Sequence, residues 1–435
     1  MSGSTSPLIE REAGEPFAFH RGRVLTVRDF LRDVYNAADG LREGDHVINA
    51  CEDRYRFLVG FFAALARGCT SLLPPSRTAD EIRRLEARYE GAHVLTDERV
   101  LLHDHESGSS GETCPLPDLA DTATAAIAFT SGSTGQPQPH PKPWGALRAG
   151  ASMHAERLGT TEPATLVATV PPWHMYGLEW TVMVATLAPL IVHCDDAFYP
   201  NDVVRALEAA PGRRVLVTTP VHLRALMRAH TGTLRVERVV CATAPLEVDL
   251  AKAVEGRLGG RLLEIYGCTE AGTLAHRLPT ANTGWQLFPG FVMEPGDDAA
   301  AMVNAVFLPH PVPLADRLEV NEDGTFRLLG RLGDLVKVGG KRASLADLTA
   351  RLQGLPGVED AVVVDPSALG LAGRARLCAF VVAPGATAES VRKQLSRVVD
   401  PVFLPRPLKL VRELPRSPTG KLSREAVEAL LAGEP

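Results

Sequence analysis

The chain has 435 residues, and its composition, 45% hydrophobic and 23% charged, is that of an ordinary globular protein. This excludes a largely disordered chain and a small disulfide scaffold. With 46 Lys and Arg against 52 Asp and Glu, the net charge is −6. A broad nucleic-acid or anionic-membrane surface is therefore not expected, although a local basic pocket remains compatible with this charge. At roughly 150 residues per domain, the length predicts two to three domains.

The cysteines and the apolar segments predict a cytoplasmic protein. The seven cysteines are scattered and form no C-x-x-C pair, which favours reduced thiols over a disulfide framework or a zinc finger. The first residues are polar and acidic and lack the pattern of a signal peptide. The longest apolar run, 181–192, is interrupted by Pro189 and is shorter than the ~20 residues that span a bilayer. We expect no membrane span.

Short apolar segments that predict strands alternate along the chain with amphipathic segments that predict helices. This alternation is typical of parallel α/β sheets covered by helices on both faces. The predicted strands are 46–51, 92–97, 124–129, 165–170, 189–194, 213–219 and 235–242. The predicted helices between them include 30–41, 56–68, 203–210 and 221–229.

The pattern changes near residue 333. Two predicted helices (345–355 and 388–399), two predicted strands (360–365 and 376–383) and a basic tail follow. Two strands and two helices in about a hundred residues predict a compact α+β lid domain. We therefore predict a large domain at 1–332 and a small mobile domain at 333–435.

A segment rich in hydroxyls and glycine, TSGSTG, directly follows the predicted strand 124–129. Its backbone N–H groups can approach an anion closely and its hydroxyls add donors, which favours a phosphate-binding loop. It is not the G-x-x-x-x-G-K-[ST] loop of other nucleotide sites. Taken alone, it is equally typical of a Ser/Gly linker. Its residues are Thr130, Ser131, Gly132, Ser133, Thr134 and Gly135.

Five further motifs follow in order, and together with TSGSTG they resemble the core motifs of the adenylate-forming superfamily. That superfamily contains acyl- and aryl-CoA ligases, luciferases and the adenylation domains of peptide synthetases. The resemblance covers nearly the whole chain, from about residue 24 to about residue 430. The motifs are PPWHMYG (171–177), EIYGCTEAG (264–272), ADRLEVNEDG (315–324), GRLGDLVKVGGKR (330–342) and PRSPTGKLSRE (415–425).

The resemblance implies a site for ATP and Mg²⁺. TSGSTG is expected to wrap the β- and γ-phosphates, and Tyr266 to lie against adenine with its aromatic face. Thr269 is expected to bond the α-phosphate, and Glu270 to hold Mg²⁺, a hard ion that prefers oxygen ligands. Taken alone, Glu270 could instead cap a helix that begins in TEAG.

The same resemblance implies roles for residues nearer the C-terminus. Asp316 is expected to accept hydrogen bonds from both ribose hydroxyls, and Arg331 to contact the ribose and α-phosphate region. Lys421 is expected to reach from the small domain to the α-phosphate and the substrate carboxylate. Taken alone, Asp316 and Lys421 would be read as surface residues. Gly333 is the expected hinge, since glycine tolerates large changes in φ and ψ. The expected thiol tunnel is lined by Gly339, Gly340 and Lys341.

The aromatic cluster around residue 174 resembles the region of the family that borders the acyl pocket, and the resemblance therefore implies an acid-binding pocket here. The catalytic residues that it implies are Lys421, Thr269, Glu270 and His174. A wall of Trp, Tyr and His favours a flat aromatic acid over a long alkyl chain. A buried turn packed by the same rings is the simpler alternative, and both can hold together. The predicted pocket residues are Trp173, His174, Tyr176, Thr243, Ala244, Gly267, Cys268 and Trp285.

The chain departs from the family pattern after TSGSTG. Where the family commonly has lysine, this chain has Gln138, and the next cation is Lys142. Phosphate neutralisation is therefore weaker or is supplied by Lys142. This PQPHPKPW variant and the compact length resemble the adenylating enzymes of bacterial aryl-polyene and xanthomonadin pigment pathways, which load hydroxybenzoate-like acids onto a thiol.

The predicted function is activation of a carboxylic acid with ATP to acyl-AMP, followed by transfer to a phosphopantetheine thiol of CoA or of an acyl carrier protein. The predicted partners are thus a small carboxylic acid and, for the second step, CoA or a carrier protein. A non-catalytic acyl-adenylate-binding protein that kept the fold is the alternative, motivated by Gln138. A luciferase-like oxidase is a third class of function, and no residue in the sequence indicates it specifically.

Overall fold

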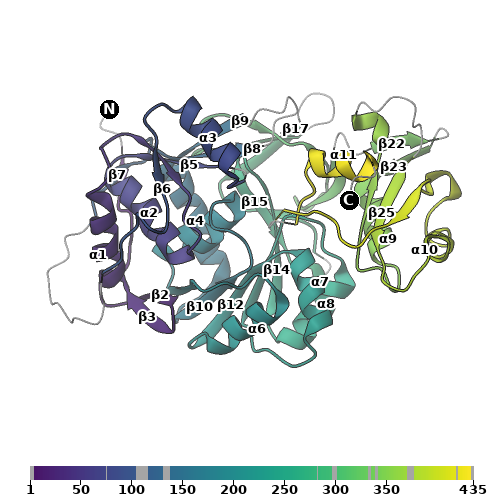
Figure 1. Ribbon diagram of the computed structural model, residues 1–435, viewed down its shortest axis with the longest axis horizontal. Helices are drawn as coiled ribbons and strands as arrows, with labels where there is room; N and C mark the ends of the chain where they lie inside the picture. Colours follow the sequence, from purple (N-terminus) through teal and green to yellow (C-terminus); the bar gives the residue numbers. More distant parts are fainter. Residues whose placement is uncertain are drawn as a thin grey trace.

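The computed structural model describes residues 4–74, 76–103, 116–130, 138–281, 283–295, 301–331, 335–338, 341–369, 377–417 and 420–432. Two large, mainly parallel sheets with helices packed around them form most of the molecule (Figure 1). Smaller antiparallel sheets follow, and the last hundred residues form a separate lobe at one end of the long axis. The predicted α/β class, with a large N-terminal part and a small C-terminal part, is confirmed.

The larger sheet has nine strands in the order β16-β15-β14-β13-β12-β10-β11-β2-β3. Its centre is parallel, from β14 to β2, and antiparallel hairpins form both edges. Because its parallel strands are buried on both faces, they read as continuous apolar runs. Its strands are β2 Pro16–His20, β3 Arg23–Thr26, β10 Ala164–Ala168, β11 Leu190–His193, β12 Arg213–Thr218, β13 Arg238–Cys241, β14 Arg261–Cys268, β15 Gly272–Arg277 and β16 Gln286–Leu287.

The second sheet has five strands in the order β6-β4-β5-β8-β9. It is parallel except for β9, which returns antiparallel to β8 and forms the edge. A two-stranded ribbon, β1 with β7, lies outside both large sheets. These strands are β1 Thr5–Ser6, β4 His46–Asn49, β5 Thr70–Leu73, β6 His93–Leu95, β7 Leu119–Ala120, β8 Thr124–Thr130 and β9 Gln138–Pro143.

Capping residues define an end of two helices in the large part. In α1, Thr26 and Asp29 form a reciprocal capping box, which satisfies two otherwise unpaired N–H groups. In α4, the left-handed Gly159 ends the helix at little steric cost. The helices are α1 Val27–Ala38, α2 Arg54–Ala66, α3 Ala79–Arg88, α4 Trp144–Leu158, α5 Met175–Gly177, α6 Pro200–Ala209, α7 Pro220–Ala229 and α8 Val248–Leu258. A π-helix, Leu178–Met183, and the 3-10 segments Val184–Thr186 and Pro279–Ala281 complete them.

Antiparallel strands connect the nine-stranded sheet to the C-terminal lobe. They form a three-stranded sheet, β17-β18-β19, and the hairpin β20-β21. The described residues between β14 and β15 form a turn that joins two strands, and no helix begins there. The alternative in which Glu270 caps a helix is therefore wrong. These strands are β17 Phe291–Pro295, β18 Ala301–Ala305, β19 Val312–Pro313, β20 Asp316–Val320 and β21 Phe326–Arg331.

The C-terminal lobe contains more structure than the sequence predicts. Besides the expected two strands and two helices, it has the hairpin β22-β23, the strand β26 and the helix α11. The three-residue strand β26 is too short to stand out by periodicity. The elements are β22 Leu335–Val338, β23 Lys341–Ser344, α9 Leu345–Gln353, β24 Asp360–Val364, β25 Cys378–Val382, α10 Ala388–Leu395, β26 Leu408–Leu410 and α11 Arg424–Ala432. Short 3-10 segments lie at Pro366–Leu369 and Pro401–Phe403.

The lobe has a hydrophobic cluster of its own, to which α9, β24, β25 and α10 contribute. A hydrogen bond from the Arg228 guanidinium to the Val358 carbonyl, 2.7 Å, ties it to α7 of the large part. The predicted domain boundary at 332/333 lies outside the described residues. Within the described part of the chain, no helix combines the length and the hydropathy needed to cross a membrane. No disulfide joins the described cysteines, and Cys114 lies outside them.

Candidate active site

Two residues predicted to bind the nucleoside meet in the structure. The Tyr266 hydroxyl, near the end of β14, donates to a carboxylate oxygen of Asp316 at 2.8 Å. Asp316 opens β20, and the antiparallel register pairs its backbone with Arg331 at the end of β21. Three predicted residues from segments far apart in the sequence are thereby brought to one place. The side chain of Arg331 is not among those described.

Trp285, predicted to line the acid pocket, packs beside this pair. Its ring centroid lies 5.7 Å from that of Tyr266 and 6.5 Å from that of Phe326. The Arg277 guanidinium lies over the Trp285 ring, 4.7 Å from its centroid. The indole is almost fully buried. The structure thus groups Trp285 with the predicted nucleoside residues, and its contact with the acid stays a prediction.

The predicted phosphate loop, residues 130–135, begins at the last residue of β8, and β9 starts three residues after its end. Thr130, its first residue, pairs with Gln138 across the two antiparallel strands. The Thr130 hydroxyl lies 2.9 Å from Nε2 of His140, two residues along β9 from Gln138. The remaining predicted loop residues lie outside the described ones: Ser131, Gly132, Ser133, Thr134 and Gly135.

The turn between β14 and β15 carries Thr269 and Glu270, and at two positions neighbouring atoms leave no room for a side chain. A Cβ on Gly267 would lie 2.4 Å from the Gly272 carbonyl oxygen. A Cβ on Gly272, whose φ is +80°, would lie 2.3 Å from a carboxylate oxygen of Glu179. Both positions therefore require glycine, and this tight turn leaves the Glu270 side chain exposed.

Two side chains of β9 reach this turn. Because residues two apart on a strand point to the same face, His140 and Lys142 are presented together. Nε2 of His140 lies 3.7 Å from a carboxylate oxygen of Glu270. The ammonium of Lys142 donates to the backbone carbonyl of Glu270 at 2.6 Å. Thr130, at the start of the phosphate loop, is thus connected through His140 to the predicted metal ligand.

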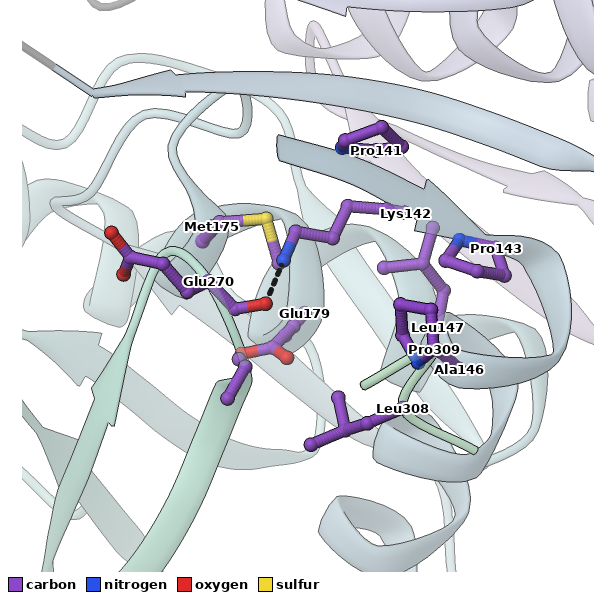
Figure 2. Close-up of a pocket in the computed structure, with 12 residues that line it drawn as sticks. Pro141, Lys142, Pro143, Ala146, Leu147, Met175, Glu179, Glu270, Leu308 and Pro309 are labelled. Atoms are coloured by element: carbon purple, nitrogen blue, oxygen red, sulfur yellow. Dashed lines mark hydrogen bonds between the residues drawn. The ribbon is translucent and has the colours of Figure 1, made fainter. Parts of the chain in front are cut away.

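A buried carboxylate that sequence reasoning missed, Glu179, holds the other end of the turn. It lies in the π-helix and accepts hydrogen bonds from the Thr273 hydroxyl, 2.7 Å, and the Thr273 backbone N–H, 3.2 Å. Burial raises the pKa of Glu179, and the Thr273 hydrogen bonds and the charge of Lys142 oppose that rise. Figure 2 shows Lys142 and Glu179 lining one pocket beside the turn, with the Glu270 carboxylate pointing away from Lys142. An acidic residue inside the apolar run HMYGLEWTVM was the available signal.

His174 lies beside charged groups from both parts of the molecule. Burial, together with the charges of Lys421 and Arg77, lowers the pKa of His174 to about 4. At neutral pH the imidazole is therefore uncharged. The C-terminal lobe places Lys421, the predicted catalytic lysine, near the predicted acid pocket of the large part.

Arg77 is a second residue that sequence reasoning missed. Its guanidinium lies 3.4 Å from the ring centroid of Trp173 and donates to the backbone carbonyl oxygens of Cys51 and Asn49. A guanidinium over an indole face is a favourable cation–π contact. Trp173 is in turn 6.0 Å from His174, ring to ring. Arg77 stands alone after β5, with no motif around it to mark it.

The other predicted acid-pocket residues lie at the ends of neighbouring strands. The Tyr176 hydroxyl donates to the Val240 carbonyl at 2.9 Å and to the Thr218 carbonyl at 3.1 Å, which fixes its ring at the ends of β12 and β13. Thr243 has φ of +84°, a strained conformation for a β-branched residue and one that clusters at functional sites. Ala244 follows it and is exposed.

Cys268, the last residue of β14 and the remaining predicted pocket residue, is not a nucleophile at neutral pH. Burial and the nearby Glu270 raise the pKa of its thiol to about 12, although a hydrogen bond with Ala271 and the charge of Lys142 act in the other direction. The thiol therefore stays protonated. Its predicted role is that of pocket wall, which requires no ionisation.

The loop that carries Lys421 is anchored at both ends. The Arg416 guanidinium donates to the Asp360 carboxylate at 2.6 and 2.8 Å and to the Gly420 carbonyl at 2.8 Å. A Cβ on Gly420 would lie 3.2 Å from the Val221 side chain, so this loop packs against the start of α7. The predicted hinge and two of the tunnel residues, Gly333, Gly339 and Gly340, lie outside the described residues, as does the side chain of Lys341.

The protein side chains near the turn fit a magnesium ion that is bound mainly by the phosphates of the nucleotide. In the described part of the chain, no group of three or more His, Cys, Asp or Glu side chains is arranged around a metal position. Glu270 offers one exposed carboxylate at the turn, 3.7 Å from His140, which itself contacts Thr130. Mg²⁺ commonly takes one or two protein carboxylates and completes its shell with substrate phosphates and water.

The comparisons with known proteins agree with this arrangement. Residues 9–300 match the AMP-binding enzyme family, and residues 350–421 match the C-terminal domain of AMP-binding enzymes. The chain belongs to the AMP-binding enzyme family, the adenylate-forming superfamily that its motifs resemble. Its relatives include a 4-coumarate–CoA ligase of Rhodobacter capsulatus, 32% identical over 311 residues, or 69% of this chain and 76% of that one. A 4-coumarate–CoA ligase of Halorhodospira halophila is 29% identical over 341 residues, 73% of this chain and 82% of that one.

Solved structures share the fold at low sequence identity. An ATP-bound RpMatB-BxBclM chimera superposes with a TM-score of 0.80 at 18% identity, covering 98% of each chain. The O-succinylbenzoate coenzyme A synthetase of Bacillus subtilis, in complex with AMP, superposes with a TM-score of 0.78 at 17% identity, covering 94% of this chain and 95% of that one. At such identities, these likenesses establish the fold.

Proposed function

We propose that this protein uses ATP to activate an aromatic, hydroxybenzoate-like carboxylic acid and transfers the acyl group to a phosphopantetheine thiol of CoA or of an acyl carrier protein. The observation that carries the proposal is the meeting of residues from both lobes, in which Lys421 lies close enough to His174 to lower its pKa. Membership of the AMP-binding enzyme family supports the same activity. The 4-coumarate–CoA ligases among its relatives support an aromatic acid and CoA as acceptor.

In the first step a carboxylate oxygen attacks the α-phosphorus of ATP, and the bond to pyrophosphate breaks. Tyr266 and Asp316 would hold the nucleoside, and Thr269 the α-phosphate. Mg²⁺, bound by Glu270 and the phosphates, would neutralise part of the triphosphate charge. Lys421 would contact the carboxylate and the α-phosphate, so that charge accumulating between the two anions is stabilised in the transition state.

In the second step the thiol sulfur attacks the acyl-AMP carbonyl, AMP leaves, and the thiol proton is released. We propose that the domain 333–435 rotates about Gly333 between the steps, because glycine tolerates the required change in backbone angles. The loop at 338–342 would then line the approach of the thiol. The uncharged His174 would border the acyl group without adding a second positive charge.

The test is acid-dependent release of pyrophosphate, measured with benzoates, cinnamates and a C12 fatty acid. Hydroxylated aromatic acids should release pyrophosphate faster than the fatty acid. A clear preference for the fatty acid would overturn the proposed substrate class. A protein that binds acyl-AMP but releases no pyrophosphate with any acid would instead be a non-catalytic binder. A parallel thioester assay with CoA and with a purified carrier protein identifies the acceptor.

A further inference from the structure

The turn that carries Thr269 and Glu270 is held at both ends by buried charged side chains. The Lys142 ammonium donates to the Glu270 carbonyl at 2.6 Å, and the Glu179 carboxylate accepts from the hydroxyl and N–H of Thr273. Lys142 is 5% exposed and Glu179 is 6% exposed. Buried charges are costly unless they are hydrogen-bonded and compensated. Two of them beside the three-residue turn 269–271 therefore call for an explanation.

The two charges compensate each other across the pocket of Figure 2. Burial lowers the pKa of Lys142, and the negative charge of Glu179 is the largest effect that opposes the fall. The Glu270 carboxylate points away from Lys142. Gly272 lies between Glu270 and Thr273, the two residues that accept from Lys142 and donate to Glu179. Because it has no side chain, the Glu179 carboxylate can approach the turn closely.

We propose that Lys142 and Glu179 are positioning residues, which hold the β14–β15 turn so that Thr269 and Glu270 face the nucleotide. Lys142 then acts through the turn and does not contact the β- and γ-phosphates in place of the lysine missing at Gln138. The inference rests on the proposed function, which assigns Thr269 to the α-phosphate and Glu270 to the metal.

The geometry favours this role over direct phosphate binding. For Lys142 to reach a phosphate, its ammonium would have to leave the Glu270 carbonyl and the neighbourhood of Glu179. That movement would leave a buried carboxylate without its countercharge, which is strongly unfavourable. The phosphate loop joins β8 to β9 beyond Thr130 and Gln138, whereas Lys142 lies four residues further along β9.

AMP distinguishes the two roles because it has an α-phosphate but no β- or γ-phosphate. Binding of AMP and of Mg²⁺-ATP, both without acid so that no turnover occurs, is measured by calorimetry for wild type, Lys142→Met and Glu179→Gln. We expect both variants to weaken AMP and ATP binding to a similar extent, about 10- to 100-fold, the effect of losing one charge-assisted hydrogen bond. Lys252→Met, at an exposed lysine of α8, is the matched control and should leave both affinities unchanged.

Gln138→Lys provides the second discriminating variant. If Lys142 positions the turn, adding Gln138→Lys to Lys142→Met restores neither affinity. The proposal is overturned if Lys142→Met weakens ATP alone and Gln138→Lys restores it, because that pattern belongs to a phosphate-binding cation. It is also overturned if Glu179→Gln leaves AMP binding unchanged.

A milder variant keeps the test usable should Lys142→Met fail to fold. Thr273→Val removes one hydroxyl bond to Glu179 without adding bulk, and we expect a smaller loss of AMP and ATP affinity in equal proportion. Equal affinities in Thr273→Val and wild type would count against the proposal. Absence of AMP binding in the wild type would refute the proposed function itself, so the two failures are distinguishable.

Discussion

Replacing Lys421 by alanine should separate the two proposed half-reactions. In the structure, the loop anchored by Arg416 packs against α7 and brings the charge of Lys421 near His174, the placement that the proposed first step needs. Loss of a charge-assisted contact made in the transition state costs about 3–4 kcal/mol, or roughly 10²–10³ in rate. We expect Lys421→Ala to slow acyl-AMP formation by about that factor.

The assay measures each half-reaction on the same protein preparations. Pyrophosphate release reports the first step, and thioester formation from chemically supplied acyl-AMP and thiol reports the second. Lys421→Ala should form thioester at nearly the wild-type rate, because the rotated lobe no longer presents this residue. Lys393→Ala, at an exposed lysine of α10, is the control and should retain both steps. Gly333→Pro should impair overall turnover more than either isolated step, because proline fixes φ at the proposed hinge.

An equal loss of both half-reactions in Lys421→Ala would refute this reasoning. The residue would then serve general binding or folding, and rotation of the lobe would lose its main support. A loss confined to thioester formation would reverse the assignment of Lys421 to the first step.

Three further outcomes follow from the geometry. Gly272→Ala should lower the melting temperature, measured by calorimetry, and the affinity for AMP. The reasons are that a positive φ costs a non-glycine residue about 1–2 kcal/mol and that the new Cβ would meet Glu179. Gly256→Ala, in open space on α8, is the control and should be neutral or stabilising. Asp316→Asn should raise the KM for ATP more than the KM for the acid in steady-state kinetics, because its charge serves the ribose. His154→Phe should improve acid tolerance in urea titrations. Burial lowers the pKa of this histidine to about 3, so the unfolded chain binds its proton first and stability falls as pH drops below about 6.5. At pH 5 the variant should recover about 2 kcal/mol of that loss, and an unchanged pH dependence would contradict this account.

Motif order predicted which residues meet, but not every residue that supports them. Tyr266 and Asp316 lie 50 positions apart and share a hydrogen bond, and each stands in a motif by which the sequence could single it out. Glu179 and Arg77 contact residues of the site from elements that only packing brings close to it. A carboxylate within an apolar run and a lone arginine after a strand have no spacing that marks them, so sequence reasoning passed over both.

The strand β9 shows why a departure from the family pattern carries structural meaning. Its sequence, QPHPKP, has proline at alternate positions, which a central strand could not accept because proline has no N–H to donate. In an edge strand, alternate N–H groups point away from the sheet, so Pro139 and Pro141 can lie opposite residues of β8, as His140 and Lys142 do, without losing a ladder bond. The same alternation turns both of these side chains toward the turn at Glu270. The prolines therefore close the edge of the sheet to further strands, and the residues between them supply the contacts that we propose hold the nucleotide-binding turn.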